Sequence, residues 1–192
     1  MSKYSKGVSF EKEAFERIQE VLESNYIFDY YLISDVAYQG INLFEQIDAM
    51  LVCKYGVYCL EMKNWKCEVH PNNDDMWPIY ENGVKTHREF PNPTIQNNRH
   101  CASIKYLIDQ NYAPFKNIPV YNLVVFSDNT EISDSEKDNV VYLDDIAKYI
   151  VKHNANVPED ICRDIIKILK YFKNKYFPKY RELHMHQIKT IS

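Results

Sequence analysis

The sequence has little glycine, no long apolar run and no strong net charge. Only 4 of its 192 residues are glycine, which excludes collagen-like and glycine-rich linker proteins. No apolar stretch approaches the ~18–20 residues that a membrane span needs, and the first fifteen residues lack the apolar core of a secretory signal. The formal net charge of −4 does not by itself indicate nucleic-acid binding. We therefore expect a cytoplasmic protein without membrane association.

The cysteines also exclude two classes of protein. There are 5 of them, an odd number, and none forms a CxxC pair. This pattern disfavours a disulfide framework or a structural zinc site and agrees with a reducing cytosol. Hydrophobic residues make up 45% and charged residues 26%, the composition of an ordinary globular protein. The length is that of one domain, so we expect residues 1–192 to form a single domain.

Hydrophobic periodicity predicts an α/β fold with a mixed β-sheet flanked by helices. Polar residues with Pro91 and Pro93 predict a surface loop over 81–93. Pro178 is expected to end the last helix. The predicted helices span 9–24, 93–110, 144–152 and 158–177. The predicted strands span 30–36, 45–53, 57–65, 121–126 and 140–143, and short strands at 68–70 and 76–80 extend the same sheet.

Two carboxylates and one amine lie on neighbouring predicted strands. Asp48 is on the first strand, and Glu61 and Lys63 are on the next. Because side chains alternate along a strand, Glu61 and Lys63 point to the same face. Burial of ionised groups costs several kcal/mol each unless they pair or bind something. This end of the sheet is therefore the first place to look for a functional site.

The connection between the two strands decides which of these side chains meet. A four-residue loop places Asp48 opposite Glu61, and a two-residue loop places it opposite Lys63. A three-residue loop turns Asp48 to the other face unless a bulge restores the parity. The sequence leaves these alternatives open.

Neighbouring carboxylates repel each other unless a hard cation lies between them. Mg²⁺ takes oxygen ligands and keeps several waters, so one or two carboxylates and a substrate phosphate suit it. Such an ion can polarise a phosphoryl oxygen and activate a water molecule. A nearby lysine can orient that water or stabilise the charge that develops on phosphorus. The pattern therefore predicts an Mg²⁺ site, with Mn²⁺ as a substitute.

Short motifs follow one another in a fixed order along the chain. They are G-x-x-x-E at 7–11, I-D-h-h-h-V at 47–52, G-V-h-h-h-E-h-K-N-W at 56–65, a tryptophan at 77 and N-P-x-x-Q-x-x-x-H at 92–100. Together they resemble the nuclease-related domain (NERD) family of the PD-(D/E)xK nucleases. The resemblance implies a restriction-endonuclease-like core over about 7–126, with a C-terminal strand and helices over about 140–178 packed on it.

The resemblance also implies roles for individual residues. Asp48 and Glu61 would ligate the metal, and Lys63 would be the catalytic lysine. Glu11 would be a helix-borne carboxylate that reaches the site, although Glu13 and Glu16 compete for this role. Gln96 would lie on the helix that lines the other side, where Asn92 and His100 are weaker candidates. The implied activity is Mg²⁺-dependent phosphodiester hydrolysis by a DNA endonuclease.

Other interpretations remain open for the same residues. Asp48 or Glu61 could form a structural ion pair with Lys63. The protein could then be a nucleic-acid-binding or interaction module that keeps the fold without turnover, and a displaced or self-paired set of these three side chains would mark it. An RNA-cleaving enzyme on the same scaffold is a further alternative. A protein partner that supplies a helicase or targeting function is also an expectation.

The C-terminal part of the chain is basic, whereas the remainder is acidic. From Arg163 onward there are 8 Lys and Arg against 2 Asp and Glu, a local charge of +6 against −10 for the rest. Basic and aromatic residues alternate over 167–181, a composition compatible with base stacking and phosphate contact. Lys170 and Lys173 are the candidate nucleic-acid contacts, and a solvated helix face is the alternative.

Overall fold

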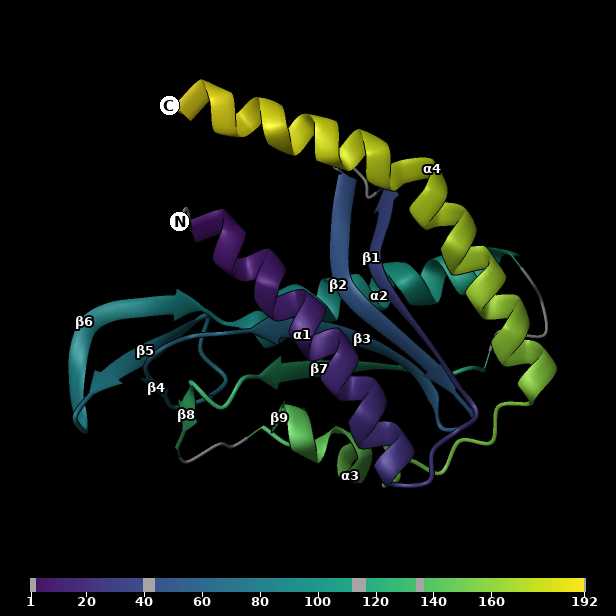
Figure 1. Cartoon of the computed structure of the whole chain (residues 1–192), viewed down its shortest axis with the longest axis horizontal. Coiled ribbons are helices and arrows are strands. Elements are labelled where there is room, and N and C mark those ends of the chain that lie inside the picture. The colour runs from purple at the N-terminus through teal and green to yellow at the C-terminus, as the bar shows by residue number, and fades with distance from the viewer. Residues whose placement is uncertain (1–2, 40–43, 112–116, 134–136, 192) are drawn as a thin grey trace.

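A five-stranded mixed sheet forms the centre of the computed structural model, which describes residues 3–39, 44–111, 117–133 and 137–191 (Figure 1). Its strand order is β1-β2-β3-β7-β9. Pairing is antiparallel from β1 to β3 and parallel from β3 to β9. The predicted mixed α/β fold is thus confirmed. The strands are β1 (Tyr30–Gln39), β2 (Phe44–Cys53), β3 (Gly56–Lys63), β7 (Val120–Phe126) and β9 (Val140–Tyr142).

Helices cover both faces of this sheet. In the described residues the α-helices are α1 (Lys3–Ser24), α2 (Pro93–Asn111), α3 (Ile146–Ile150) and α4 (Glu159–Ile191), and a 3₁₀ turn at Leu143–Asp145 precedes α3. Figure 1 shows α1 in front of the sheet and α2 behind it. Alternation along β3 explains the two cores, because Tyr58 and Leu60 pack under α1 and α3, whereas Val57 and Cys59 pack under α2 and α4.

A second, four-stranded sheet has the order β6-β5-β4-β8. The expectation that the short strands extend the first sheet is therefore wrong. The predicted loop over 81–93 is also wrong, because most of it forms β6. Asn82 (φ 53°) and Gly83 (φ 75°) form a tight turn of the kind that favours hairpins, and an edge strand tolerates Pro91. These strands are β4 (Glu68–Val69), β5 (Met76–Glu81), β6 (Val84–Pro91) and β8 (Glu131–Ile132).

Two helices are longer than predicted. The first begins at Lys3 rather than at residue 9, and the last continues through Pro178 to Ile191. A proline inside a helix removes one hydrogen bond and bends the helix, but it does not force an end. Figure 1 shows α4 as a bent helix. Within the described part of the chain, no helix has the length and apolar character to cross a membrane.

Candidate active site

The register of the β2–β3 hairpin brings the two predicted metal ligands level with each other. Cys53 pairs with Gly56, so the connection has two residues, and the ladder runs to the pair Ala49 and Leu60. One further step places Asp48 level with Glu61. The expectation that a two-residue loop places Asp48 opposite Lys63 is wrong. That pairing requires a turn centred one residue later along the chain.

Asp48 lies where the β2–β3 ladder ends. Its Oδ2 accepts a hydrogen bond of 2.8 Å from the backbone N–H of Met62, so the carboxylate takes the place of a strand carbonyl. Burial raises the pKa of Asp48 to about 7, and the negative charge of Glu61 adds to this effect. Asp48 in its charged form is therefore unfavourable without a cation nearby.

Glu61 is the most deeply buried carboxylate of the site. The residue is 2% exposed. Its Oε1 accepts an ion-paired hydrogen bond from Nζ of Lys63, whose side chain is 21% exposed. Its Oε2 is buried and has no hydrogen-bond partner. A buried carboxylate oxygen without a partner is unusual, and it indicates a place for a donor or a cation.

Glu11 differs in burial from the two other candidate glutamates of α1. Glu11 is partly buried, whereas Glu13 and Glu16 are exposed. Burial raises the pKa of Glu11, the charges of Asp35 and Glu61 raise it further, and Lys63 opposes them. The Glu11 carboxylate is therefore within electrostatic range of the same group of charges. Sequence reasoning missed Asp35, which lies on β1 with a φ of 54° and carries no motif.

A buried polar chain approaches Glu61 from α2, on the face of the sheet that Glu61 shares with Val57 and Cys59. His100 on α2 is 4% exposed, and its Nε2 lies 3.9 Å from Oε2 of Glu61. Its Nδ1 lies 3.0 Å from the hydroxyl of Tyr38, which donates a hydrogen bond of 2.6 Å to Glu45. Burial lowers the pKa of His100, and the charges of Glu61 and Glu45 act against this effect. Tyr38 and Glu45 belong to no motif and were not predicted.

On α2, the predicted residue and its neighbour have different environments. Gln96 is exposed and lies one helical turn before His100. Asn97 is fully buried, and its amide donates hydrogen bonds of 2.8 Å to the carbonyl of Cys59 and 2.7 Å to Oδ1 of Asn122. Asn97 thus fixes α2 to the sheet beside the site.

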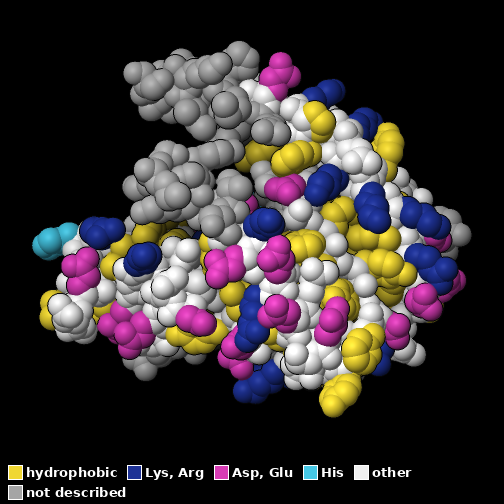
Figure 2. All heavy atoms as spheres, viewed as in Figure 1, with side chains coloured by type: hydrophobic (Ala, Val, Ile, Leu, Met, Phe, Trp, Pro, Cys, Tyr) yellow, Lys and Arg dark blue, Asp and Glu magenta, His cyan; other side chains and the backbone are white. Residues whose placement is uncertain are grey.

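The two predicted lysines of α4 also differ. Lys170 is exposed. Lys173 is partly buried, because its Nζ donates a hydrogen bond of 2.7 Å to the carbonyl of Ser34 and lies 3.8 Å from Oδ2 of Asp35. Figure 2 shows Lys and Arg side chains along the side of the molecule that α4 covers. Of the two, Lys170 is the better placed for contact with a ligand in solvent.

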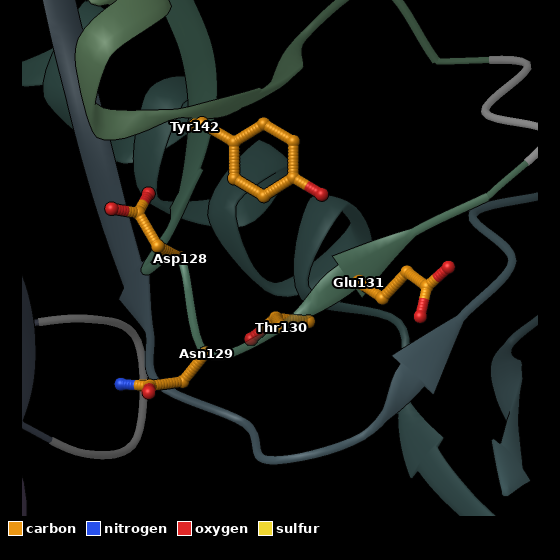
Figure 3. A pocket seen from close by; sticks show the side chains of 5 residues that line it. All are labelled: Asp128, Asn129, Thr130, Glu131 and Tyr142. Carbon is orange, nitrogen blue, oxygen red and sulfur yellow. The ribbon is translucent and has the colours of Figure 1, made fainter. Parts of the chain in front are cut away.

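An open pocket contains none of the predicted site residues. It is lined by Asp128, Asn129, Thr130, Glu131 and Tyr142. Figure 3 shows the carboxylates of Asp128 and Glu131 pointing away from each other, so the pocket offers no convergent charged groups. Among the residues that the structure describes, no three His, Cys, Asp or Glu side chains already form a group that could hold a metal ion.

Comparison with known protein families gives a match. The family model described as the nuclease-related domain matches residues 6–127, which is more than half of the chain. The matched segment contains Asp48, Glu61 and Lys63, and α4 lies outside it. No curated protein and no solved structure matched the chain.

Proposed function

Because this chain belongs to the nuclease-related domain family, within the PD-(D/E)xK-like nucleases, we propose that it is a metal-dependent nuclease that hydrolyses phosphodiester bonds. DNA is the first candidate substrate, and internal cleavage is the proposed mode. One observation carries the proposal: Asp48, Glu61 and Lys63 converge where β2 and β3 stop pairing.

The side chains present suit a divalent cation. Asp48 has a raised pKa of about 7, and Oε2 of Glu61 is buried without a hydrogen-bond partner. A cation would relieve both, and Mg²⁺ or Mn²⁺ completes its shell with water and phosphate oxygens when few protein ligands are present. Asp48 and Glu61 are therefore the proposed ligands. When bound, such a cation would polarise a phosphoryl oxygen and lower the pKa of the water molecule that attacks the phosphorus.

Lys63 would act on the charge that develops during hydrolysis. In the structure its Nζ is ion-paired with Glu61, so the ammonium is held beside the carboxylates. A cation bound by Glu61 would weaken this pair and leave Nζ free to contact a phosphate oxygen or a water molecule. In a partly buried site, an ammonium group close to the developing charge stabilises the transition state more than it would in water.

Glu11 and Gln96 have proposed supporting roles from opposite sides. The charges of Glu61 and Lys63 both act on the Glu11 carboxylate. This supports the proposed role of Glu11, which is to reach the site directly or through a water molecule. Gln96 is exposed one turn before His100, which suits contact with a substrate rather than support of the fold. Lys170 and Lys173 on α4 remain the proposed nucleic-acid contacts.

The test is a cleavage assay with isosteric variants. Wild-type protein with Mg²⁺ or Mn²⁺ should nick or degrade DNA, and Asp48→Asn, Glu61→Gln and Lys63→Met should each lower the rate by about 10²–10⁴-fold. Asp48→Asn retains an oxygen for the Met62 N–H, so the strand end is preserved. Panels of single- and double-stranded DNA and RNA separate the DNA endonuclease from the RNA-cleaving alternative. Cleavage at the wild-type rate by all three variants would remove the assignment.

One observation favours a second candidate, a nucleic-acid-binding module without turnover. The ion pair between Lys63 and Glu61 is the self-paired arrangement that this alternative predicts. The two candidates differ in the response to metal. A nuclease binds the cation through Asp48 and Glu61, whereas a binding module keeps the ion pair and binds nucleic acid equally well in the presence of a chelator.

A further inference from the structure

Two buried acceptors face each other at the base of the site. Oε2 of Glu61 and Nε2 of His100 lie 3.9 Å apart, and neither has a hydrogen-bond partner. Their side chains are 3% and 5% exposed. The separation is too long for a direct hydrogen bond. It is close to the spacing of two atoms that ligate one ion, because ligand distances of about 2.0–2.2 Å place neighbouring ligand atoms about 3–3.6 Å apart.

The hydrogen bonds around His100 fix which ring nitrogen carries the proton. The hydroxyl of Tyr38 gives its only hydrogen to Glu45, at 2.6 Å. It can therefore only accept from Nδ1 of His100, which lies 3.0 Å away. Oε2 of Glu45 is a second acceptor at 3.4 Å from the same nitrogen. In the neutral ring, Nδ1 is thus the protonated nitrogen, and the lone pair is on Nε2, which lies 3.9 Å from Oε2 of Glu61.

This arrangement is the one that metal-binding histidines adopt. Such histidines donate the N–H of the other ring nitrogen to a carboxylate, a carbonyl or a similar acceptor, which fixes the tautomer and aims the free nitrogen at the ion. Here Tyr38 and Glu45 supply that acceptor chain, and Glu61 supplies a carboxylate oxygen beside the free nitrogen.

We propose that His100 is a nitrogen ligand of the catalytic cation, next to Glu61, and that it makes the site selective for transition-metal ions over Mg²⁺. This inference rests on the proposed metal site of the nuclease and concerns which ion that site takes. Imidazole binds first-row ions more strongly as the series proceeds from Mn²⁺ to Co²⁺, whereas Mg²⁺ prefers oxygen. The preferred ion is therefore Mn²⁺ or a later divalent ion, and Mg²⁺ is the weaker one.

The test measures metal binding without nucleic acid. Calorimetric titration of the metal-free full chain should give a dissociation constant at least about tenfold lower for Co²⁺ than for Mg²⁺. His100→Gln replaces the nitrogen ligand by an amide, so it should weaken Co²⁺ binding about 10–100-fold and change Mg²⁺ binding less than about threefold. His87→Gln removes an exposed histidine of β6 and should change neither.

A measurement on the wild-type chain removes any dependence on the folding of the variant. Electron spin-echo spectroscopy of the Mn²⁺-loaded protein should show the ¹⁴N coupling of a directly bound imidazole. Three results would each overturn the inference. They are the absence of this coupling, the lack of a Co²⁺ preference in the wild type, and an equal weakening of Co²⁺ and Mg²⁺ binding by His100→Gln. The two proposals fail in different ways. A site that selects transition-metal ions but does not cleave nucleic acid refutes only the nuclease activity. Cleavage without a metal selectivity that depends on His100 refutes only the assignment of His100 as a ligand.

Discussion

At the scale of single residues, Asp48 destabilises the metal-free fold at neutral and alkaline pH. Its pKa is raised from 3.8 to about 7, first by burial and then by Glu61. Between these two values the folded state binds more protons than the unfolded state, so stability falls as the pH rises from about 4 to 7. Above pH 7 the charged carboxylate keeps its full unfavourable contribution.

Replacement of Asp48 by asparagine should therefore stabilise the protein when a chelator is present. At pH 8 we expect Asp48→Asn to raise the free energy of unfolding by about 1–3 kcal/mol, and at pH 5 by clearly less. Urea unfolding at the two pH values measures this difference. A variant that is less stable than wild type at pH 8 would show that the charge of Asp48 is satisfied in another way.

The predicted site residues share a local signal, and the missed ones do not. Asp48, Glu61 and Lys63 are charged residues on apolar strands, so alternation and the motif order mark them in the sequence. Tyr38 and Glu45 meet His100 only because β1, β2 and α2 pack together. Contacts between three separate elements leave no spacing in the chain that could have predicted them.

At the scale of elements, the β2–β3 turn sets the register of the site, and Gly56 permits that turn. Gly56 has a φ of 134°, and a Cβ there would lie 2.7 Å from Cε2 of Tyr121. We expect Gly56→Ala to lower the free energy of unfolding by about 2–4 kcal/mol, because it combines backbone strain with a steric clash.

Gly83→Ala is the matched control for this prediction. Gly83 also has a positive φ, 75°, but a Cβ there meets nothing within 4 Å. Its substitution should cost about 1 kcal/mol from backbone strain alone. Thermal or urea unfolding of both variants measures the difference, and equal losses would contradict a steric role for Tyr121.

The attachment of α2 to the sheet gives another prediction at this scale. Asn97→Leu leaves the carbonyl of Cys59 and Oδ1 of Asn122 without their buried donor, so we expect a loss of about 2–3 kcal/mol in the free energy of unfolding. Gln96→Ala removes the exposed neighbour and should cost less than about 0.5 kcal/mol. A similar loss in both variants, measured by urea unfolding, would contradict the assigned role of Asn97.

Elements with strong apolar periodicity could be predicted, and elements at the edges could not. The central strands and α2 were found within one or two residues of their observed ends. The strand β6 was missed because it is mostly exposed and polar, which are the properties of a loop. The sequence does not predict the extension of α4 past Pro178, because a proline commonly ends a helix, whereas here residues on both sides keep helical geometry and the helix bends.

At the scale of the whole molecule, the charge distribution would give a nucleic acid, the proposed partner, a preferred side. The segment from Arg163 onward carries a charge of +6 on a chain whose remainder carries −10. Most of this segment forms α4, which packs on β1 and β2, and Lys173 of α4 lies 3.8 Å from Asp35, a carboxylate that influences Glu11. A phosphate backbone that follows α4 would therefore lie close to the site.

We expect this approach to appear as a salt-dependent contribution of Lys170. With Glu61→Gln as a background that prevents cleavage, Lys170→Gln should weaken DNA binding and reduce the slope of log K against log salt by about 0.9, the value for one lost phosphate contact. Lys152→Gln removes an exposed lysine just after α3, on the opposite side of the central sheet, and should leave the slope unchanged. Fluorescence anisotropy over a range of salt concentrations measures both slopes. An unchanged slope for Lys170→Gln, or equal changes for the two variants, would place the nucleic acid away from α4, because only a local phosphate contact separates these two lysines.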